Sequence, residues 1–278
     1  MCRWMAYKGT PVFLDDLIFG TEYSLIQQSL AARRSDSRTN GDGFGIAWYQ
    51  HHESPGLYRA IRPAWNDENL RDLASQINCS VFMAHVRAAT GTEIQRSNCH
   101  PFRYGKWCFV HNGLIQHFDM IRRRLLAEVH PELFNHIRGT TDSELMFYLA
   151  LGLGLENDPV LALELMTGLV ENLAEEHAIA NAVQMTVGLT DGKTVYAVRY
   201  STCGESRTLF HSKSRGALAE LNPQAANFDE QSVAVVSEPY THLDDYWEEI
   251  PESTAVVISD TGIERRRFTP RLPEQGHF

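Results

Sequence analysis

The chain lacks the features that mark several large classes of protein. None of its 278 residues belongs to a run of roughly 18 uninterrupted apolar residues, which a membrane helix requires, and the first residues lack the apolar core of a signal peptide. The five cysteines include no Cys-x-x-Cys pair, so neither a disulfide framework nor a thiolate zinc site is predicted. We therefore expect a cytoplasmic protein with reduced thiols and no contact with a membrane.

Basic residues are also scarce. Lys and Arg number 25 against 35 Asp and Glu, which gives a formal net charge of -10. The arginine runs at residues 122–124 and 265–267 are interpreted as solvated faces, and no nucleic-acid partner is expected. No internal repeat, low-complexity tract or Pro/Gly/Ser-rich linker divides the chain, so residues 1–278 are predicted to form a single domain.

Apolar patterning predicts both helices and strands. Helical periodicity is seen at residues 118–126 and 145–153, and leucines four apart indicate a third helix over residues 159–177. The Asp191-Gly192 turn predicts a hairpin. Strands are predicted at residues 44–49, 57–61, 81–86, 106–110, 182–190, 194–200, 207–211, 233–237 and 255–259. Strands, then helices, then strands again suggest helices packed on largely antiparallel sheets.

Cys2 is the most informative residue that is present. Removal of Met1 would make it the N-terminal residue, with a thiol and an α-amine on one carbon skeleton. A thiol with a pKa of about 8.5 is mostly protonated at neutral pH, and an α-amine with a pKa near 8 can take its proton. The alternative is that Cys2 is simply one of five cysteines that falls early in the chain.

A glycine-rich stretch at residues 40–45 resembles a phosphate loop at first sight. A phosphate loop leads from a strand into a helix, whereas this stretch leads into the predicted strand at residues 44–49. We interpret it as a tight turn, which either brings backbone close to a site or has no further role.

Two other segments carry residues suited to acyl transfer. Arg87 follows an apolar run, where it would lie at the rim of a sheet. His111-Asn112-Gly113 ends another apolar run, and an Asn amide beside a Gly N–H offers two donors to an oxyanion. Each segment alone has an ordinary structural alternative, because strand-end arginines form rim ion pairs and Asn-Gly is a common turn dipeptide.

The order of these motifs resembles that of the glutaminase domain of class II glutamine amidotransferases, which are N-terminal-nucleophile hydrolases. The resemblance covers nearly the whole chain and is strongest with stand-alone members that cleave γ-glutamyl compounds in ergothioneine biosynthesis and glutathione degradation. The motifs are Cys2 and the segments at residues 40–45, 84–90, 98–102, 111–113 and 140–144. The resemblance implies an α+β fold, a four-layer αββα sandwich of two mostly antiparallel sheets, with Cys2 at the start of a central strand.

The resemblance also implies roles for individual residues. Cys2 would attack a γ-carbonyl, with its own α-amine as base, and a thioester would then be hydrolysed. Asn112 and the amide of Gly113 would hold the oxyanion. The remaining roles concern the substrate: Arg87 would bind its α-carboxylate, Thr90 would add a hydroxyl there, and Asp142 would bind its α-ammonium. For Asp142 the alternative is a helix cap on a helix that begins at Ser143.

Several alternatives stay open. Gly91 stands where amidotransferases that feed a synthase usually carry a histidine, so ammonia transfer would need a separate synthase or peptidase subunit. The candidate functions are therefore a γ-glutamyl amidohydrolase acting on a small-molecule substrate, a glutaminase subunit of a two-chain enzyme, and a non-catalytic γ-glutamyl-binding module.

Metal and cofactor chemistry is not expected. His85, His100 and His111 lack the spacing of a helical metal site, and each accompanies a motif that is explained otherwise. A papain-like pair that used Cys99 or Cys108 would leave Cys2 without a role.

Overall fold

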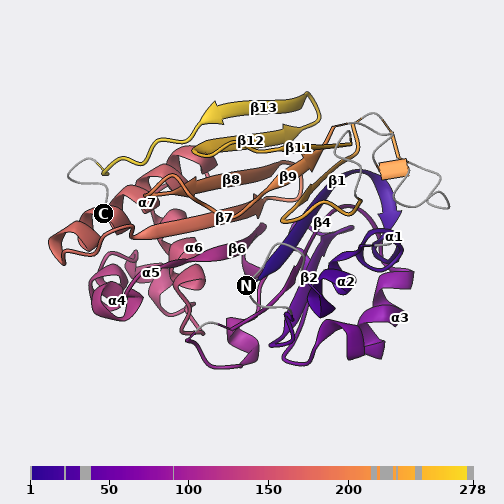
Figure 1. Cartoon of the computed structure of the whole chain (residues 1–278), viewed down its shortest axis with the longest axis horizontal. Coiled ribbons are helices and arrows are strands. Elements are labelled where there is room, and N and C mark those ends of the chain that lie inside the picture. Colours follow the sequence, from indigo (N-terminus) through magenta and orange to yellow (C-terminus); the bar gives the residue numbers. More distant parts are fainter. Residues whose placement is uncertain are drawn as a thin grey trace.

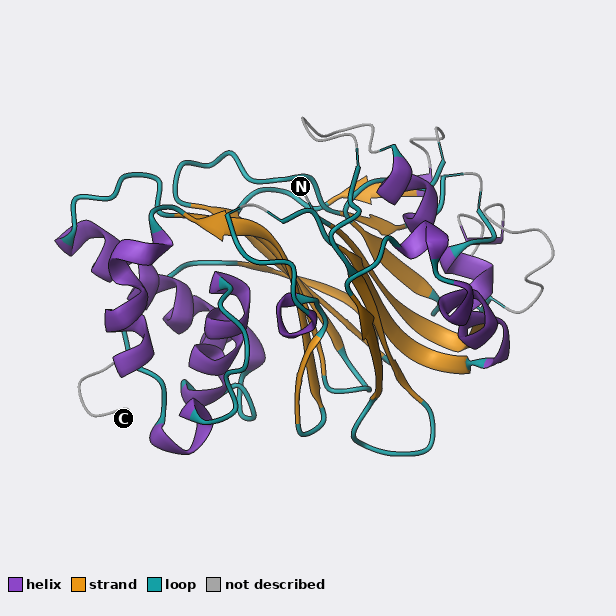
Figure 2. Cartoon of the chain, turned by 90° about the horizontal axis from the view of Figure 1, so that it is seen from below, coloured by secondary structure: helices purple, strands orange, loops and turns teal. Residues whose placement is uncertain are grey.

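Two sheets lie face to face, and helices cover their outer faces (Figures 1 and 2). The computed structural model describes residues 2–21, 23–31, 39–89, 91–213, 218–219, 228–229, 231–241 and 246–273. Every strand pair in these residues is antiparallel. The α+β class and the four-layer αββα sandwich are therefore confirmed.

The first sheet has seven strands and the second has six. In spatial order the first sheet contains β11 (Trp247–Glu249), β9 (Phe210–Ser212), β10 (Val233–Val236), β1 (Arg3–Phe13), β4 (Asn78–Val86), β2 (Phe44–Tyr49) and β3 (Gly56–Ala60). The second contains β13 (Gly262–Arg267), β12 (Thr254–Ser259), β8 (Val195–Ser201), β7 (Val183–Thr190), β6 (Trp107–Ile115) and β5 (Phe102–Tyr104). The strand that follows Cys2 is thus central in its sheet, as predicted.

The helices form two separate groups. The group on the first sheet contains α1 (Leu14–Ile18), α2 (Leu25–Leu30), the 3-10 turn η1 (Ala64–Asn66) and α3 (Glu68–Gln76). The group on the second sheet contains α4 (Phe118–Ala127), α5 (Pro131–Phe134), α6 (Asp142–Gly152) and α7 (Pro159–Glu176). A second 3-10 turn, η2 (Arg96–Asn98), lies in the loop between β4 and β5. No helix in these described residues is long and apolar enough to span a membrane.

Strand alternation explains why both faces of each sheet are apolar. In β1 the side chains of Trp4 and Ala6 pack between the sheets, whereas those of Met5 and Tyr7 pack against the first group of helices. Successive side chains of a strand point to opposite faces, so one segment supplies two cores. Because all four side chains are buried, β1 has no polar alternation, and pattern analysis of the sequence did not predict it.

Most of the other predicted elements are confirmed with small shifts in their bounds. The strand at residues 44–49 and the hairpin at Asp191-Gly192 are present, and Gly192 has the positive φ of 86° that such a turn favours. The strand predicted to end at residue 110 continues to Ile115, because β6 pairs with β7 along this whole stretch. The residues of β13 are exposed, as expected for its arginines.

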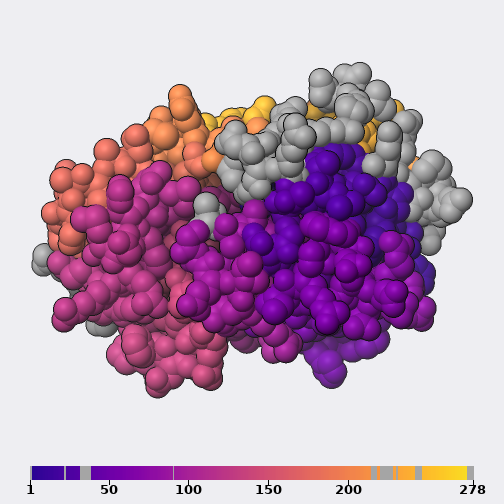
Figure 3. Space-filling view, turned by 60° about the horizontal axis from the view of Figure 1, so that its bottom comes forward, coloured from indigo at the N-terminus to yellow at the C-terminus, as the bar shows by residue number. Residues whose placement is uncertain are grey.

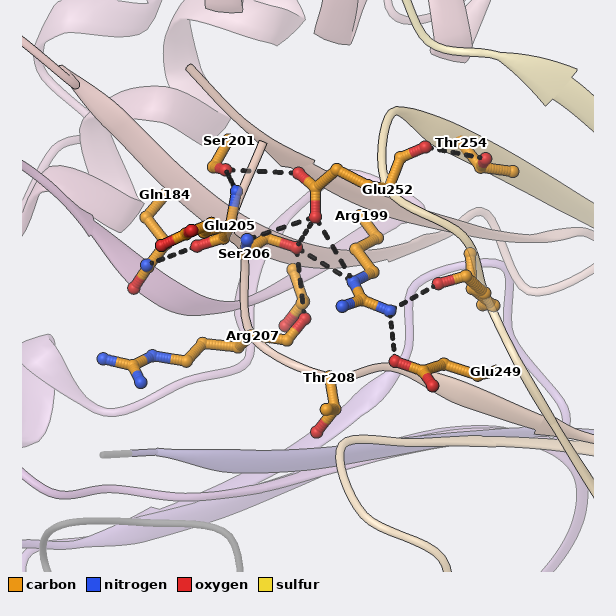
Figure 4. A network of polar contacts seen from close by, with 12 residues as sticks. Gln184, Arg199, Ser201, Glu205, Ser206, Arg207, Thr208, Glu249, Glu252 and Thr254 are labelled. Carbon is orange, nitrogen blue, oxygen red and sulfur yellow. Dashed lines mark hydrogen bonds and ion pairs between the residues drawn. The ribbon is translucent and has the colours of Figure 1, made fainter. Parts of the chain in front are cut away.

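A polar network joins β8 to the segments that lead into β9 and β12 (Figure 4). Arg199 donates to Ser206 Oγ at 2.9 Å and to Glu249 Oε1 at 2.6 Å. Glu252 accepts from both Ser201 and Ser206. This network ties the second sheet to the chain that returns to the first sheet.

Candidate functional site

A cavity of about 670 Å³ lies where the ends of the two sheets meet. Figure 3 views the molecule from below, where the indigo and purple surface of the first sheet and its helices adjoins the magenta surface of β6 and α4–α6. The cavity is lined by Cys2, by residues after β4, by the end of β6 and by the first residues of α4 and α6. Cys2, Arg87, Gly113 and Asp142 are therefore brought together from four parts of the chain.

Cys2 is held beside the end of β4. Arg3 pairs with Val86, so the antiparallel register places Cys2 next to the residues that follow β4. The half-buried Cys2 thiol lies 3.6 Å from the carbonyl oxygen of Ala88. Burial raises the pKa of the Cys2 thiol, and the positive charges of Arg87 and Arg3 oppose this shift. The thiol is therefore protonated at neutral pH and requires a base before it can act as a nucleophile.

The turn at residues 40–45 supports the other side of the same segment. Arg87 N donates to Gly43 O at 2.8 Å, and Asp42 N donates to Arg87 O at 3.0 Å. The Asp42 carboxylate accepts from Ala89 N at 2.7 Å. Gly43 has a φ of 119°, which a residue with a side chain rarely adopts. The stretch leads into the strand β2 rather than into a helix, as predicted.

Arg87 is a buried cation that faces the cavity without a carboxylate partner. The residue is 3% exposed, and its guanidinium donates to Thr92 Oγ1 at 2.6 Å and to Glu93 O at 3.2 Å. None of the ion pairs found within the described part of the chain includes Arg87. A buried guanidinium with neutral partners is suited to bind an incoming carboxylate.

Gly113 occupies a position in β6 where no side chain fits. A Cβ atom there would lie 1.9 Å from the carbonyl oxygen of Gln184 on β7. The residue lines the cavity. His111-Asn112-Gly113 therefore lies inside β6 rather than at its end, because Leu114 and Ile115 continue the pairing with β7.

Asn112 is adjacent to the cavity but is not one of its lining residues. It is 3% exposed, and its carbonyl accepts from Thr186 Oγ1 at 3.3 Å. By strand alternation its side chain shares a face with that of Val110, which packs between the sheets with Trp4. The Asn112 amide thus points toward the sheet that carries Cys2.

Asp142 is the first residue of α6 and connects this helix to β6. Its carboxylate accepts from Ile115 N at 2.9 Å and from Ser143 N at 2.7 Å. The helix cap is Thr141, whose hydroxyl accepts from Glu144 N at 3.2 Å, so the alternative of Asp142 as a cap on a helix from Ser143 is wrong. Asp142 also lines the cavity, opposite in charge to Arg87.

Three buried histidines lie among these residues, and two of them, His100 and His111, line the cavity. His111 Nδ1 lies 2.8 Å from Ser143 Oγ, and the rings of His85 and His100 stack with their centroids 4.1 Å apart. Burial lowers the pKa of all three, that of His85 to about 3. They are therefore neutral at pH 7, and within the ranges that the structure describes no set of His, Cys, Asp and Glu side chains is arranged to hold a metal ion.

Asn98 is a site residue to which the sequence analysis assigned no role. Its amide nitrogen donates to Glu93 O at 3.0 Å and to Thr140 Oγ1 at 3.1 Å, and its amide oxygen accepts from Thr140 N at 2.8 Å. Glu93 O also accepts from Arg87. Asn98 thus links the loop that holds Arg87 to the segment that leads into Asp142.

Two further expectations concern cavity residues. Thr90 lies outside the described residues, and its neighbours Ala89 and Gly91 line the cavity. Arg122 is half-buried and lines the cavity, whereas Arg123 and Arg124 are exposed, so residues 122–124 lie on a solvent-facing surface as predicted. The helical turn between Arg122 and Phe118 places both on the cavity side of α4.

Comparison with known proteins places these features in a family. The family described as "Glutamine amidotransferases class-II" matches residues 19–275. The chain is 31% identical to the probable glutamine amidotransferase DUG3 of Saccharomyces cerevisiae, over 95% of this chain and 83% of the yeast protein. It is 26% identical to the gamma-glutamyl-hercynylcysteine sulfoxide hydrolase of Mycolicibacterium smegmatis, over 95% of this chain and 98% of that protein.

A solved structure gives the same result. The glutamine aminotransferase class-II domain protein from Silicibacter pomeroyi is 32% identical and has a TM-score of 0.73, over 97% of this chain and all of that one. The resemblance found from the motifs, including that to the stand-alone γ-glutamyl branch, is confirmed. This chain belongs to the class II glutamine amidotransferases.

Proposed function

We propose that this protein is a thiol hydrolase that cleaves the γ-amide of glutamine or of a small γ-glutamyl compound, with Cys2 as the nucleophile once Met1 has been removed. The observation that carries the proposal is the cavity lined by Cys2, Arg87 and Asp142. It brings a thiol, the guanidinium of Arg87 and the carboxylate of Asp142 to one cavity, whose wall also contains Arg122, Glu93 and Asp119, and a free γ-glutamyl group carries both opposite charges.

The reaction begins with proton transfer inside Cys2. The unprotonated α-amine takes the thiol proton, and the thiolate attacks the γ-carbonyl carbon of the substrate. The tetrahedral intermediate then expels the leaving amine, which receives the proton back, and a thioester remains. In the second half of the reaction the α-amine takes a proton from water, and the water oxygen attacks the thioester. The Cys2 sulfur leaves and recovers the proton, so glutamate is released and the thiol and the amine return to their starting states.

The geometry of β6 supports Gly113 as an oxyanion donor. Ile115 N donates to Asp142 and so points away from β7, and N–H groups two residues apart in a strand point the same way. Gly113 N–H therefore points to the same side as Ile115 N–H. The neighbouring strand β5 pairs with β6 only up to Phe109, so it leaves this side open at Gly113. The Asn112 amide would supply the second donor.

Two charges explain the choice of substrate. Arg87 would bind the α-carboxylate through a bidentate contact, and Asp142 would bind the α-ammonium. A glutamine inside a peptide has neither charge, so it would gain neither contact. The hydroxyl of Thr90 is proposed to assist at the carboxylate.

The proposed substrates are not limited to glutamine, because the group attached to the γ-carbonyl can differ. One relative is named as a hydrolase of a γ-glutamyl compound, which supports γ-glutamyl amides as substrates here. A separate synthase or peptidase subunit is proposed only as a candidate partner, and co-purification tests it.

All five cysteines are free thiols, in keeping with the proposed cytoplasmic location.

Intact-mass analysis tests the nucleophile. The native protein is predicted to lack Met1 and to gain one adduct from 6-diazo-5-oxo-norleucine, a glutamine-like alkylating agent. Cys2→Ala should lose the adduct and all hydrolysis of a panel of glutamine, glutathione and other γ-glutamyl amides. Cys203→Ala is the matched control, because Cys203 is an exposed thiol. An adduct that persists in Cys2→Ala, or a mature protein that retains Met1, would refute the proposal.

A further inference from the structure

The segment after β10 holds the backbone of the residues that follow Cys2. Ser237 N donates to Trp4 O at 3.1 Å, and Trp4 N donates to Ser237 Oγ at 3.0 Å. Ser237 O in turn accepts from Thr208 Oγ1 at 3.0 Å, in the segment that the Arg199 network holds (Figure 4). Chain more than two hundred residues away in sequence thus supports the first residues of β1.

An ion pair lies at the centre of this support. Arg3 and Glu238 are 3% and 2% exposed, and Arg3 Nε donates to Glu238 Oε1 at 2.7 Å, with a second donation from Nη2 to the same oxygen. Tyr23 donates to Glu238 Oε2 at 2.9 Å. The remaining edge of the guanidinium faces the nucleophile: Arg3 Nη1 donates to Cys2 O at 2.8 Å.

A buried ion pair is a weak source of stability, because its Coulomb energy only roughly offsets the desolvation of the two charges. Its geometric effect is more specific. The planar guanidinium presents donors in a fixed fork, so Glu238 on one edge determines where the donor on the other edge lies. That donor holds the Cys2 carbonyl.

Holding this carbonyl fixes the plane of the peptide group between Cys2 and Arg3, and so places the Cα atom of Cys2. Cys2 precedes the first residue of β1, so the strand ladder that begins at Arg3 does not restrain it. With Cα placed and the thiol 3.6 Å from Ala88 O, the direction of the α-amine follows from the tetrahedral geometry at Cα. Proton transfer and attack both require these two groups in a defined orientation.

We propose that Arg3, held by Glu238 and Tyr23, is a positioning residue that orients the thiol and the α-amine of Cys2 for attack. The proposal rests on the function of Cys2 proposed above. The role belongs to the chemical step rather than to substrate binding, because neither Arg3 nor Glu238 lines the cavity. The positive charge of Arg3 also acts to lower the pKa of the Cys2 thiol, which favours the same step.

Three variants and one control test the proposal. Arg3→Lys keeps the charge but loses the fork, and Glu238→Gln keeps the shape but weakens the pair. Tyr23→Phe removes the hydroxyl that contacts Glu238 Oε2 and Ala31 O. Glu164→Gln is the control, since Glu164 is a buried carboxylate that pairs with Arg271 away from the cavity. Steady-state kinetics on a γ-glutamyl amide and the kinetics of Cys2 alkylation are measured on folded protein, and mass analysis verifies Met1 removal.

The expected result is a split between the two kinetic constants. Arg3→Lys and Glu238→Gln should lower kcat and the maximal alkylation rate by about ten- to a hundredfold, with KM changed less than about twofold. Tyr23→Phe should lower them by about threefold and provides the test if either charge variant fails to fold. The control should keep the wild-type kcat.

Two outcomes overturn the inference in different ways. If the wild-type protein is alkylated at Cys2 and the variants react as fast, or if their loss appears in KM alone or equally in Glu164→Gln, the positioning role is refuted while the nucleophile stands. If wild-type Cys2 is not alkylated, the proposed function fails and its positioning fails with it.

Discussion

Asn98→Ala tests whether Asn98 keeps Arg87 and Asp142 at a fixed separation across the cavity. The side chain of Asn98 makes three hydrogen bonds, at 3.0, 3.1 and 2.8 Å, and is fully buried. Neutral hydrogen bonds contribute about 1 kcal/mol each, so the sum suggests a loss of about 3 kcal/mol. However, Glu93 and Thr140 are exposed residues whose backbone groups water can reach in the variant. We therefore expect the free energy of unfolding to fall by about 1–2 kcal/mol.

The loss in substrate binding should be similar in size to this loss of stability. Without Asn98 the Glu93 carbonyl loses its link to Thr140, so the loop that holds Arg87 and the start of α6 can move apart. A loss of about 1.4 kcal/mol in binding corresponds to about a tenfold rise in KM. Because Cys2 is not part of this link, kcat should change less than about threefold.

Urea unfolding and steady-state kinetics on a γ-glutamyl amide measure both effects. Asn172→Ala is the matched control, since Asn172 also donates a side-chain hydrogen bond, to Glu176 on the outer surface of α7. It should alter stability by less than about 0.5 kcal/mol and leave KM unchanged. An Asn98→Ala protein that loses stability but keeps the wild-type KM would show that Asn98 only supports the fold.

Three further predictions concern charge. Arg87→Lys should raise KM by about ten- to a hundredfold because Lys lacks the bidentate fork, and an initial-rate series showing an unchanged KM would contradict the role of Arg87. Asp142→Asn should raise KM similarly and lower the thermal midpoint modestly, because the amide oxygen can still accept from Ile115 N but the amide nitrogen cannot accept from Ser143 N; calorimetry and kinetics check both. The lowered pKa values of His85 and His100 mean that the unfolded state binds more protons below pH of about 6.5. The free energy of unfolding should therefore fall as the pH drops from 7 to 5, by up to about 1.4 kcal/mol per pH unit for each histidine. His100→Phe should make the free energy of unfolding depend less on pH. A wild-type urea midpoint at pH 5 that equals or exceeds the midpoint at pH 7 would contradict the prediction.

Local patterns in the sequence predicted the elements whose two faces differ or whose turns have a distinctive chemistry. The apolar run at residues 44–49 and the Asp191-Gly192 hairpin are examples, because strand and turn preferences there depend on near neighbours. β1 was missed as a pattern because both of its faces are buried. That Cys2 begins a central strand came instead from the order of the motifs.

For the candidate site, too, the sequence predicted some features and the structure revealed others. Cys2, Arg87, Gly113 and Asp142 were identified by residue type and order, and the structure gathers them around one cavity. The placement of Asn112 beside this cavity, rather than on its wall, depends on strand alternation within β6. The roles of these residues in catalysis, and the single domain over residues 1–278, stay predictions.

The sequence by itself determined the family and the residue types of the site, because both are written in short segments that can be read in order. Only the tertiary structure decided that Asn98 links Glu93 to Thr140 and that Glu238 holds Arg3 behind Cys2. The physical reason is that a hydrogen bond between residues far apart in the chain leaves no periodic trace in either segment. Such contacts exist only once the sheets have packed.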